Sequence, residues 1–307
     1  MTLQRILENY NGENPGIKTN LARMLIHGAL ANTGKMVILP VDQGFEHGPD
    51  KSFGSNPCAY DPEYHITLAI EAGLSAFAAP LGMLEATADK YAGQIPLILK
   101  INSSTLLNSN TLDPYQAIYA SVESALKLGC IGIGFTIYPG SDSYTNMIES
   151  LAPIIEQAKQ FGLICVVWAY ARGSGIKKIH ETALDIVSYA AHMACLLGAH
   201  IVKVKPPTYN LLQNPALDKS YPKDCFNSND EKIAQTAAIK HIIKSCFNGK
   251  RMVIFSGGAA TDEQNLLKTI ECIKDGGGNG SIIGRNAFQR PRKDALLLLK
   301  QIINIYK

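Results

Sequence analysis

The sequence lacks the features that mark membrane, secreted and disordered proteins. It has no run of about 18 apolar residues, which a transmembrane helix would need, and no signal-peptide core near its N-terminus. Charged residues make up only 18% of the 307 positions and the formal net charge is +3, whereas hydrophobic residues make up 46%. This balance excludes a disordered chain, and it predicts neither a membrane nor a nucleic acid as a partner.

Cysteine and histidine occur without the spacings that bind metals or form disulfide frameworks. The seven cysteines are widely spaced, odd in number and free of Cys-x-x-Cys pairs. The seven histidines include no His-x-His or His-x-x-x-His pair. We therefore predict a soluble, cytoplasmic protein with reduced thiols, without a metal ion and without another cofactor.

Eight short apolar runs alternate with amphipathic, helix-like stretches. Because the runs are almost continuously apolar, they are typical of parallel strands that are buried on both faces. They begin at Met36, Leu74, Ile95, Ile131, Leu163, Ala199, Arg251 and Ser281. Examples of the helix-like stretches are 64–73, 114–129, 146–162, 180–198, 230–247, 263–277 and 293–307.

Eight such strand and helix units predict an α/β fold of the (β/α)8 TIM-barrel type. A doubly wound open sheet is the main alternative, because it gives the same alternation. The barrel is favoured since the count reaches eight and no Gly-x-Gly-x-x-Gly follows the first strand. Gly73, Gly129, Gly162 and Gly198 each follow a predicted helix, at a position where a helix C-cap needs a positive φ.

Two segments fall outside the repeat. Residues 1–34 are predicted to form a helical extension that covers the bottom of a barrel domain spanning 35–307. Residues 206–230 form a loop rich in proline and asparagine after the sixth strand. A loop of this length on the active-site face is predicted to act as a lid.

Lysines within apolar strands are the main chemical signal. Lys203 and Lys205 lie two residues apart in the sixth strand and so share one face, and Lys100 lies in the third strand. Burial without a partner lowers the pKa of a lysine, and an uncharged amine is a nucleophile for carbonyl groups. The alternative is an ordinary ion pair. We expect Lys205 to keep Lys203 partly uncharged by repulsion.

The seventh and eighth strands are each followed by a small-residue or arginine loop that can bind phosphate. Ser256, Gly257 and Gly258 can direct backbone N–H groups at an anion, and Gly284 with Arg285 adds a guanidinium. Phosphate binding by these two loops is common in barrels, although the glycines alone could serve only as turns.

The first and fifth strands contribute further polar side chains. Trp168 and Tyr170 alternate onto one face, where the tyrosine can transfer a proton or belong to an aromatic core pair. Asp42 ends the first strand and can act as an acid or base, as a helix N-cap or as an ion-pair partner.

Seven motifs occur in order between Val37 and Phe288: VILPVDQGFEHGP, AAPLGMLE, IPLILKINSS, VVWAYARG, GAHIVKVK, SGG and IIGRNAF. Together they resemble the archaeal and bacterial (DhnA-like) class I fructose-bisphosphate aldolases. The resemblance implies a TIM barrel, a metal-independent Schiff-base mechanism, a phosphorylated sugar as substrate and a homo-oligomer.

The resemblance also implies roles for individual residues. The Schiff-base lysine falls on Lys203, the proton-transferring tyrosine on Tyr170 and the strand-one aspartate on Asp42. The predicted substrate and phosphate contacts are Gln43, Trp168, Lys205, Ser256, Gly257, Gly258, Gly284 and Arg285. Three positions depart from the family: Gln43 replaces a common histidine, Ala171 replaces a common proline, and KVKPPTYN replaces a KYTGD-like continuation.

The predicted activity is that of a lyase, which cleaves fructose 1,6-bisphosphate and forms it in reverse. Transaldol-type or acyl transfer on another phosphorylated ketose is the alternative reaction. A phosphate-binding regulatory barrel without turnover is the alternative class. For the second phosphate of the sugar, Lys100 and Lys219 are the candidate partners.

Overall fold

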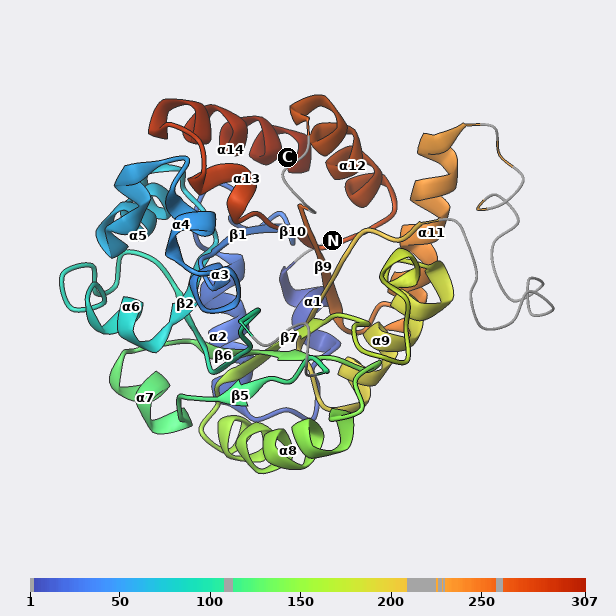
Figure 1. Cartoon of the computed structure of the whole chain (residues 1–307), viewed down its shortest axis with the longest axis horizontal. Coiled ribbons are helices and arrows are strands. Elements are labelled where there is room, and N and C mark those ends of the chain that lie inside the picture. Colours follow the sequence, from blue (N-terminus) through green and yellow to red (C-terminus); the bar gives the residue numbers. More distant parts are fainter. Residues whose placement is uncertain (1–2, 108–112, 209–224, 226–227, 229, 258–261) are drawn as a thin grey trace.

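The computed structural model describes residues 3–107, 113–208, 225, 228, 230–257 and 262–307. Eight parallel strands close into a barrel in the order β1-β10-β9-β8-β7-β6-β3-β2, and helices surround it (Figure 1). The strands are β1 Met36–Pro40, β2 Ala76–Pro80, β3 Leu97–Lys100, β6 Gly132–Ile137, β7 Ile164–Ala169, β8 Ile201–Val204, β9 Met252–Ser256 and β10 Gly280–Ile282. The predicted TIM barrel is confirmed, and the open sheet was the wrong alternative.

The helices that were predicted from the sequence lie close to their expected positions, with one exception, and several short helices were not predicted. They are α1 Leu3–Glu8, α2 Pro15–Leu25, α3 Gln43–His47, α4 Pro49–Phe53, η1 Pro57–Tyr60, α5 Pro62–Glu71, α6 Leu81–Glu85, α7 Val122–Lys127, α8 Tyr144–Gln160, η2 Lys178–His180, α9 Leu184–Leu196, α11 Glu231–Ser245, α12 Glu263–Asp275, α13 Arg285–Phe288 and α14 Arg292–Tyr306. In the described part of the chain, none is long and apolar enough to cross a bilayer.

The predicted helix over 114–129 is wrong in its first half. Ala117–Ile118 forms β5, which pairs antiparallel with β4, Asn102–Ser103, above the barrel. The helix α7 begins only after Ser121, whose hydroxyl caps it by accepting a hydrogen bond from the N–H of Ser124. Pairing with a distant segment has therefore overridden the local helical pattern.

The loops that follow helices show the predicted conformation at their glycines. Gly73, Gly129, Gly162 and Gly198 have φ values of 66°, 67°, 76° and 92°. A side chain is strained in this region of φ, whereas glycine is not. The predicted lid lies largely outside the described residues.

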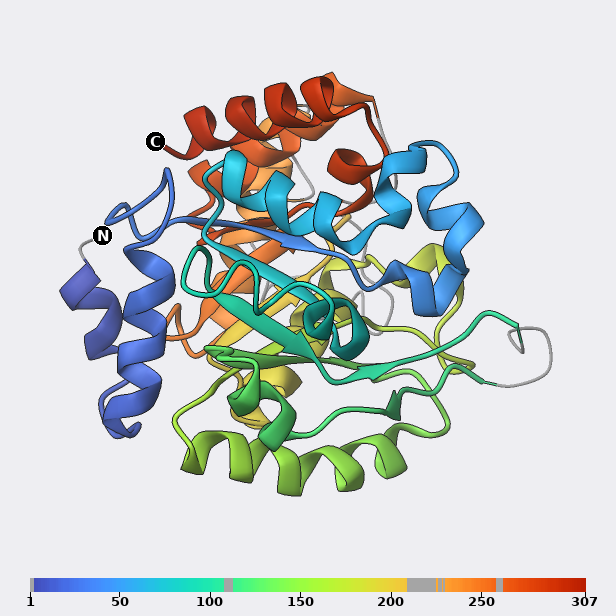
Figure 2. The ribbon, with the colours of Figure 1, turned by 90° about the vertical axis from the view of Figure 1, so that its left-hand side faces the viewer.

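The N-terminal helices α1 and α2 pack together at the bottom of the barrel, at the end opposite the loops that follow the strands (Figure 2). Their apolar side chains, including Ile6, Ile17 and Leu21, belong to one buried cluster with the inward-facing residues of the strands. The two helices thus cover the bottom of the barrel and pack against its interior.

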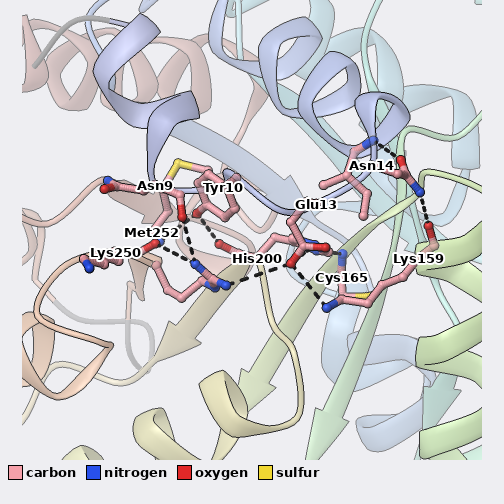
Figure 3. Close-up of polar contacts among 11 residues, drawn as sticks. Asn9, Tyr10, Glu13, Asn14, Lys159, Cys165, His200, Lys250 and Met252 are labelled. Atoms are coloured by element: carbon pink, nitrogen blue, oxygen red, sulfur yellow. Dashed lines mark hydrogen bonds and ion pairs between the residues drawn. The ribbon is translucent and has the colours of Figure 1, made fainter.

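A polar cluster ties this N-terminal segment to the strand starts (Figure 3). The hydroxyl of Tyr10 donates to the carbonyl oxygen of His200 at 2.6 Å and accepts from the N–H of Met252 at 3.1 Å. His200 is fully buried, and its Nδ1 accepts from the N–H of Cys165 at 2.8 Å. The bond at Nδ1 assigns the proton of the neutral ring to Nε2, which faces Glu13.

Glu13 is the single carboxylate of this cluster among the described residues. Its Oε1 lies 3.6 Å from Nε2 of His200, 3.3 Å from Nζ of Lys159 and 3.9 Å from a guanidinium nitrogen of Arg251. The interaction with His200, together with Lys159, lowers the pKa of Glu13 to about 2 against the opposing effect of burial.

Glu13→Gln should therefore destabilise the protein in a pH-dependent way. A carboxylate whose pKa falls on folding contributes stability above its ordinary value of 4.5, and that contribution is lost as the pH falls towards about 2. We expect E13Q to lower the free energy of unfolding by about 1–2 kcal/mol near neutral pH, with the difference shrinking below about pH 4. Urea unfolding at several pH values measures this, and a difference that is constant with pH would contradict it.

Candidate active site

Lys203 lies near the carboxyl end of β8, inside the mouth of the barrel. Its side chain is buried, with 4% of the residue exposed. Its Nζ lies 4.8 Å from the ring centre of Trp168 and 5.4 Å from that of Tyr170. Trp168 is its register partner on β7, so the three side chains lie close together at the ends of two adjacent strands.

The surroundings favour an uncharged amine at Lys203. Among the described residues, no carboxylate lies within ion-pairing distance of it. Burial lowers the pKa of Lys203 to about 7, the Asp42 carboxylate opposes this shift, and Lys100 adds to it. A substantial fraction of the amine is therefore uncharged and nucleophilic near neutral pH.

Trp168 reaches across the neighbouring strand because Gly134 has no side chain. A Cβ at Gly134 on β6 would lie 2.5 Å and 2.6 Å from two carbons of the indole ring. Gly134 in turn pairs with Lys100 on β3. The centre of the indole ring thereby lies 5.6 Å from Nζ of Lys100.

Lys100 is fixed in the wall of the site. It is 2% exposed, and its Nζ donates to the backbone oxygen and, at 2.9 Å, to Oδ1 of Asn102. Burial lowers the pKa of Lys100 to about 8, against the attraction of Asp42. These contacts argue against the role of second phosphate partner considered for Lys100. The other candidate, Lys219, lies outside the described residues.

Lys205 has a different environment from the one predicted. Strand β8 ends at Val204, and Nζ of Lys205 lies 2.6 Å from Oε2 of Glu181. Lys205 does face the ring of Tyr170, 5.7 Å from its centre. The largest cationic contribution to the lowered pKa of Lys203 nevertheless comes from Lys100. The expectation that Lys205 supplies this repulsion was wrong, because Glu181 balances its charge.

The Glu181 carboxylate belongs to a chain of ion pairs around the mouth that was not assigned a role from the sequence. Arg172 lies 2.5 Å from Oε1 of Glu46 and 3.9 Å from Oε1 of Glu181. Its guanidinium also stacks over the ring of Tyr138, 5.2 Å from the centre. Arg172 and Glu46 each lie shortly after the end of a strand, and this position in the sequence could have identified them as residues of the barrel mouth.

Asp42 provides a carboxylate that acts electrostatically on Lys203, and Tyr170 provides a phenol ring that lies against it. Asp42 precedes α3 but makes no capping hydrogen bond with its side chain, and it has no ion pair among the described residues. Burial raises the pKa of Tyr170 well above its ordinary value, and Asp42 raises it further. The phenol is therefore protonated at neutral pH, as a proton donor must be before it reacts.

The predicted phosphate loops lie next to each other at the ends of β9 and β10. Nδ2 of Asn286 donates to the carbonyl oxygen of Gly257 at 3.0 Å and so connects them. A Cβ at Gly284 would lie 3.0 Å from Nε2 of Gln43, which brings the first loop into the same place. Arg285 is half-buried and has no ion pair within the described ranges.

For the other residues that were predicted to bind phosphate, the structure gives less support. Ser256 ends β9 and is half-buried. The N–H of Gly257 donates to the carbonyl oxygen of Ile282 at 3.4 Å. Contrary to expectation, it is therefore not free to bind an anion. Gly258 lies outside the described residues.

Comparison with known proteins agrees with this geometry. Residues 36–290 match the DeoC/LacD family of aldolases. The chain belongs to this aldolase family. It is 36% identical over 306 residues to the probable fructose-bisphosphate aldolase class 1 of Chlamydia muridarum, covering 95% of this chain and 85% of the relative. It is 36% identical over 276 residues to the fructose-bisphosphate aldolase class 1 of Thermoproteus tenax, covering 90% of each.

Solved structures of aldolases have the same fold. One is an archaeal fructose-1,6-bisphosphate aldolase whose catalytic lysine is covalently bound to the carbinolamine intermediate of the substrate. It is 34% identical, with a TM-score of 0.75 over 93% of this chain and 98% of the other. A second, a Schiff-base-forming fructose-1,6-bisphosphate aldolase with reaction intermediates, is 34% identical with a TM-score of 0.74 over 89% and 95%. The family resemblance predicted from the motifs is confirmed.

The space beside Gly134 gives a test of this arrangement. Gly134→Ala should displace the indole ring of Trp168 and lower the free energy of unfolding by about 1–3 kcal/mol. Because Trp168 is the only tryptophan in the sequence, the intrinsic fluorescence spectrum should change as well. Gly82→Ala is the matched control, since its Cβ would meet nothing within 4 Å. Unchanged fluorescence and stability in G134A would contradict the described packing.

Proposed function

We propose that this protein is a class I aldolase that forms a Schiff base with fructose 1,6-bisphosphate through Lys203. It cleaves the sugar to dihydroxyacetone phosphate and glyceraldehyde 3-phosphate, and it catalyses the reverse condensation, as glycolysis and gluconeogenesis require. The observation that carries the proposal is the buried amine of Lys203, which has no ion pair in the described part of the chain and faces Trp168 and Tyr170. Family membership supports it.

The first step is attack by the uncharged amine of Lys203 on the C2 ketone of the sugar. The nitrogen lone pair forms the C–N bond while the carbonyl oxygen takes up a proton, which gives a carbinolamine. Loss of water then leaves an iminium. A pKa of about 7 provides enough free amine for attack near neutral pH, and the iminium can accept an electron pair.

Cleavage needs one group to take a proton and one to give a proton. Asp42 is the anion beside Lys203 and accepts the proton of the C4 hydroxyl as the C3–C4 bond breaks. The electron pair of that bond moves into the iminium and forms an enamine, and the aldehyde leaves. Tyr170, whose raised pKa keeps its phenol protonated, donates a proton to C3, and Asp42 returns its proton to the phenolate. Hydrolysis of the imine releases the ketone and restores Lys203.

The phosphate on C1 would be held by the loops after β9 and β10. Arg285 has no ion pair in the described ranges, and Ser256, Gly257 and Gly284 are small residues at the ends of the same two strands, where a phosphate could approach the backbone closely. Gln43 reaches the same place from the first loop. Holding this phosphate fixes the ketone beside the amine, which supplies several kcal/mol of the rate enhancement.

Borohydride trapping tests the central assignment. Reduction in the presence of dihydroxyacetone phosphate should attach the three-carbon unit to Lys203, and peptide mass mapping identifies the modified residue. Lys203→Met should form no adduct. Its cleavage rate should fall by at least about 10³-fold, because covalent catalysis is lost. An adduct on Lys100 or Lys205 would reassign the nucleophile. Activity that survives in K203M would overturn the mechanism.

A phosphate contact at Arg285 predicts a selective loss. Arg285→Gln should raise KM for phosphorylated ketoses by about 10–100-fold, because it removes a charge-assisted contact of about 1.5–3 kcal/mol. Trapping with unphosphorylated dihydroxyacetone should change little. A panel of phosphorylated ketoses in the same assay separates the aldolase from transaldol-type or acyl transfer, and binding without turnover of any of them would indicate a regulatory barrel.

We also infer a cytoplasmic location and assembly into a homo-oligomer. All seven cysteines are free thiols, which suits a reducing compartment. Exposed apolar side chains occur on the adjacent helices α9 and α11, at Tyr189, Leu196 and Ile233. Light scattering on the purified protein measures the mass of the assembly.

A further inference from the structure

The short helix α13, which begins with Arg285, ends against a side chain from the first half of the chain. The last carbonyl groups of a helix have no partners within the helix itself. Here Nδ2 of Asn56 donates to the carbonyl oxygens of Phe288 at 2.8 Å and of Arg290 at 2.9 Å. Asn56 is buried, with 7% of the residue exposed, and it lies just before η1. A residue 232 positions away in the sequence thus caps the end of α13.

The opposite contact is made by the side chain that follows α13. Nε2 of Gln289 donates to the carbonyl oxygens of Lys51 at 3.2 Å and of Ser52 at 2.9 Å, in the last turn of α4. The hydroxyl of Ser55 in turn donates to the carbonyl oxygen of Gln289 at 3.2 Å. The amide of each segment therefore satisfies the backbone of the other, and α13 lies beside α4 (Figure 1). We call the side chains of Asn56 and Gln289 the amide pair.

Aromatic side chains pack between the same two segments. The ring centres of Phe53 on α4 and Phe288 on α13 lie 5.8 Å apart, and that of His65 on α5 lies 5.2 Å from that of Phe288. Phe288 and His65 are fully buried. A Cβ at Gly44 on α3 would lie 3.7 Å from the ring of Phe53. The joint between the segments thus extends to α3, the helix that begins at Gln43.

The position of Arg285 depends on the backbone of α13. Among the described residues its guanidinium has no ion pair that would fix it. Asn286 connects the backbone of α13 to the loop after β9, through its bond to the carbonyl oxygen of Gly257. The amide pair connects it instead to the segment that follows β1. This segment includes Gln43, whose Nε2 would lie 3.0 Å from a Cβ at Gly284.

These contacts point to a role in substrate binding for two side chains outside the barrel mouth. We propose that Asn56 and Gln289 are positioning residues that set the affinity of the site for a phosphorylated substrate. Their reciprocal hydrogen bonds hold α13, and with it Arg285, against the segment that carries Gln43. Both side chains bind backbone carbonyl oxygens, so they act through Arg285 and touch neither the phosphate nor the reacting carbon atoms. The inference rests on the proposed function of Arg285 as a phosphate contact.

Breaking the hydrogen bonds of the amide pair should weaken the binding of phosphorylated compounds selectively. Gln289→Met and Asn56→Leu remove the amide donors at similar size and add no charge. Each should raise KM for fructose 1,6-bisphosphate by about 3–10-fold, which corresponds to the loss of one or two hydrogen bonds. The value of kcat should change by less than about twofold, because the phosphate is bound alike in the ground and transition states. Borohydride trapping of unphosphorylated dihydroxyacetone should proceed at the wild-type rate.

Two comparisons separate the phosphate site from the stability of the fold. Glycerol 1-phosphate has no ketone and cannot form a Schiff base, so calorimetric titration with it measures phosphate binding alone. Its Kd should rise in Q289M by the same factor as KM. Asn20→Leu is the matched control, because Nδ2 of Asn20 on α2 also donates to a distant backbone carbonyl oxygen, that of Gly162 at 2.9 Å. N20L should lower stability without changing KM or this Kd.

A double-mutant cycle tests whether the amide pair acts through Arg285. In the R285Q background, Q289M should cause no further rise in KM, because the contact that it displaces is already absent. Effects of R285Q and Q289M that simply add would show that Gln289 acts independently of Arg285, and they would overturn the inference.

The remaining outcomes distinguish this inference from the function on which it depends. If wild type forms no adduct on Lys203, the proposed Schiff-base function fails, whereas titration with glycerol 1-phosphate still decides the role of the amide pair. If Q289M and N56L fold but bind glycerol 1-phosphate as wild type does, or slow the trapping of both ketones equally, the amide pair is structural and the inference is overturned. If N56L does not fold, Q289M carries the test, since Gln289 is only half-buried.

Discussion

The site depends on one physical constraint, which is that an ammonium group in the interior of a barrel loses much of its stabilisation by water. At Lys203 this loss is not offset by an ion pair in the described part of the chain, and the pKa falls to about 7. The same burial that makes the lysine costly to accommodate makes it a nucleophile. The surrounding groups then modulate this effect: Asp42 opposes it and Lys100 reinforces it.

The rest of the barrel maintains that burial. From below, the side chains of α1 and α2 pack against the inward-facing residues of the strands, in one buried cluster that extends to Trp168. From the side, Gly134 leaves room for the indole ring, whose centre lies 5.6 Å from Nζ of Lys100 and 4.8 Å from Nζ of Lys203. The polar contacts of Tyr10, His200 and Glu13 hold the N-terminal segment against the strand starts, so the floor of the site is fixed by groups far from the amine of Lys203.

Much of this arrangement could be predicted from the sequence, because strands buried on both faces are continuously apolar and a lysine within one is conspicuous. Trp168 and Tyr170 both face Lys203, as two residues that alternate onto one face can. Residues 114–120 did not follow their helical pattern, since their pairing with Asn102–Ser103 depends on a segment distant in sequence. Lys205 was expected to lower the pKa of Lys203 because it is near in sequence. The cation that contributes most to this shift is Lys100, which lies on a strand that only barrel closure brings close.

The ion pairs around the mouth also make its electric field uneven. Arg172 and Lys205 face Glu46 and Glu181, so on that side the positive charges are balanced within the protein. On the side of β9 and β10, Arg285 has no such counter-charge in the described ranges. A molecule that carries a dianion at each end therefore meets a polarised entrance, and its direction of approach is biased before it makes its first contact with the wall.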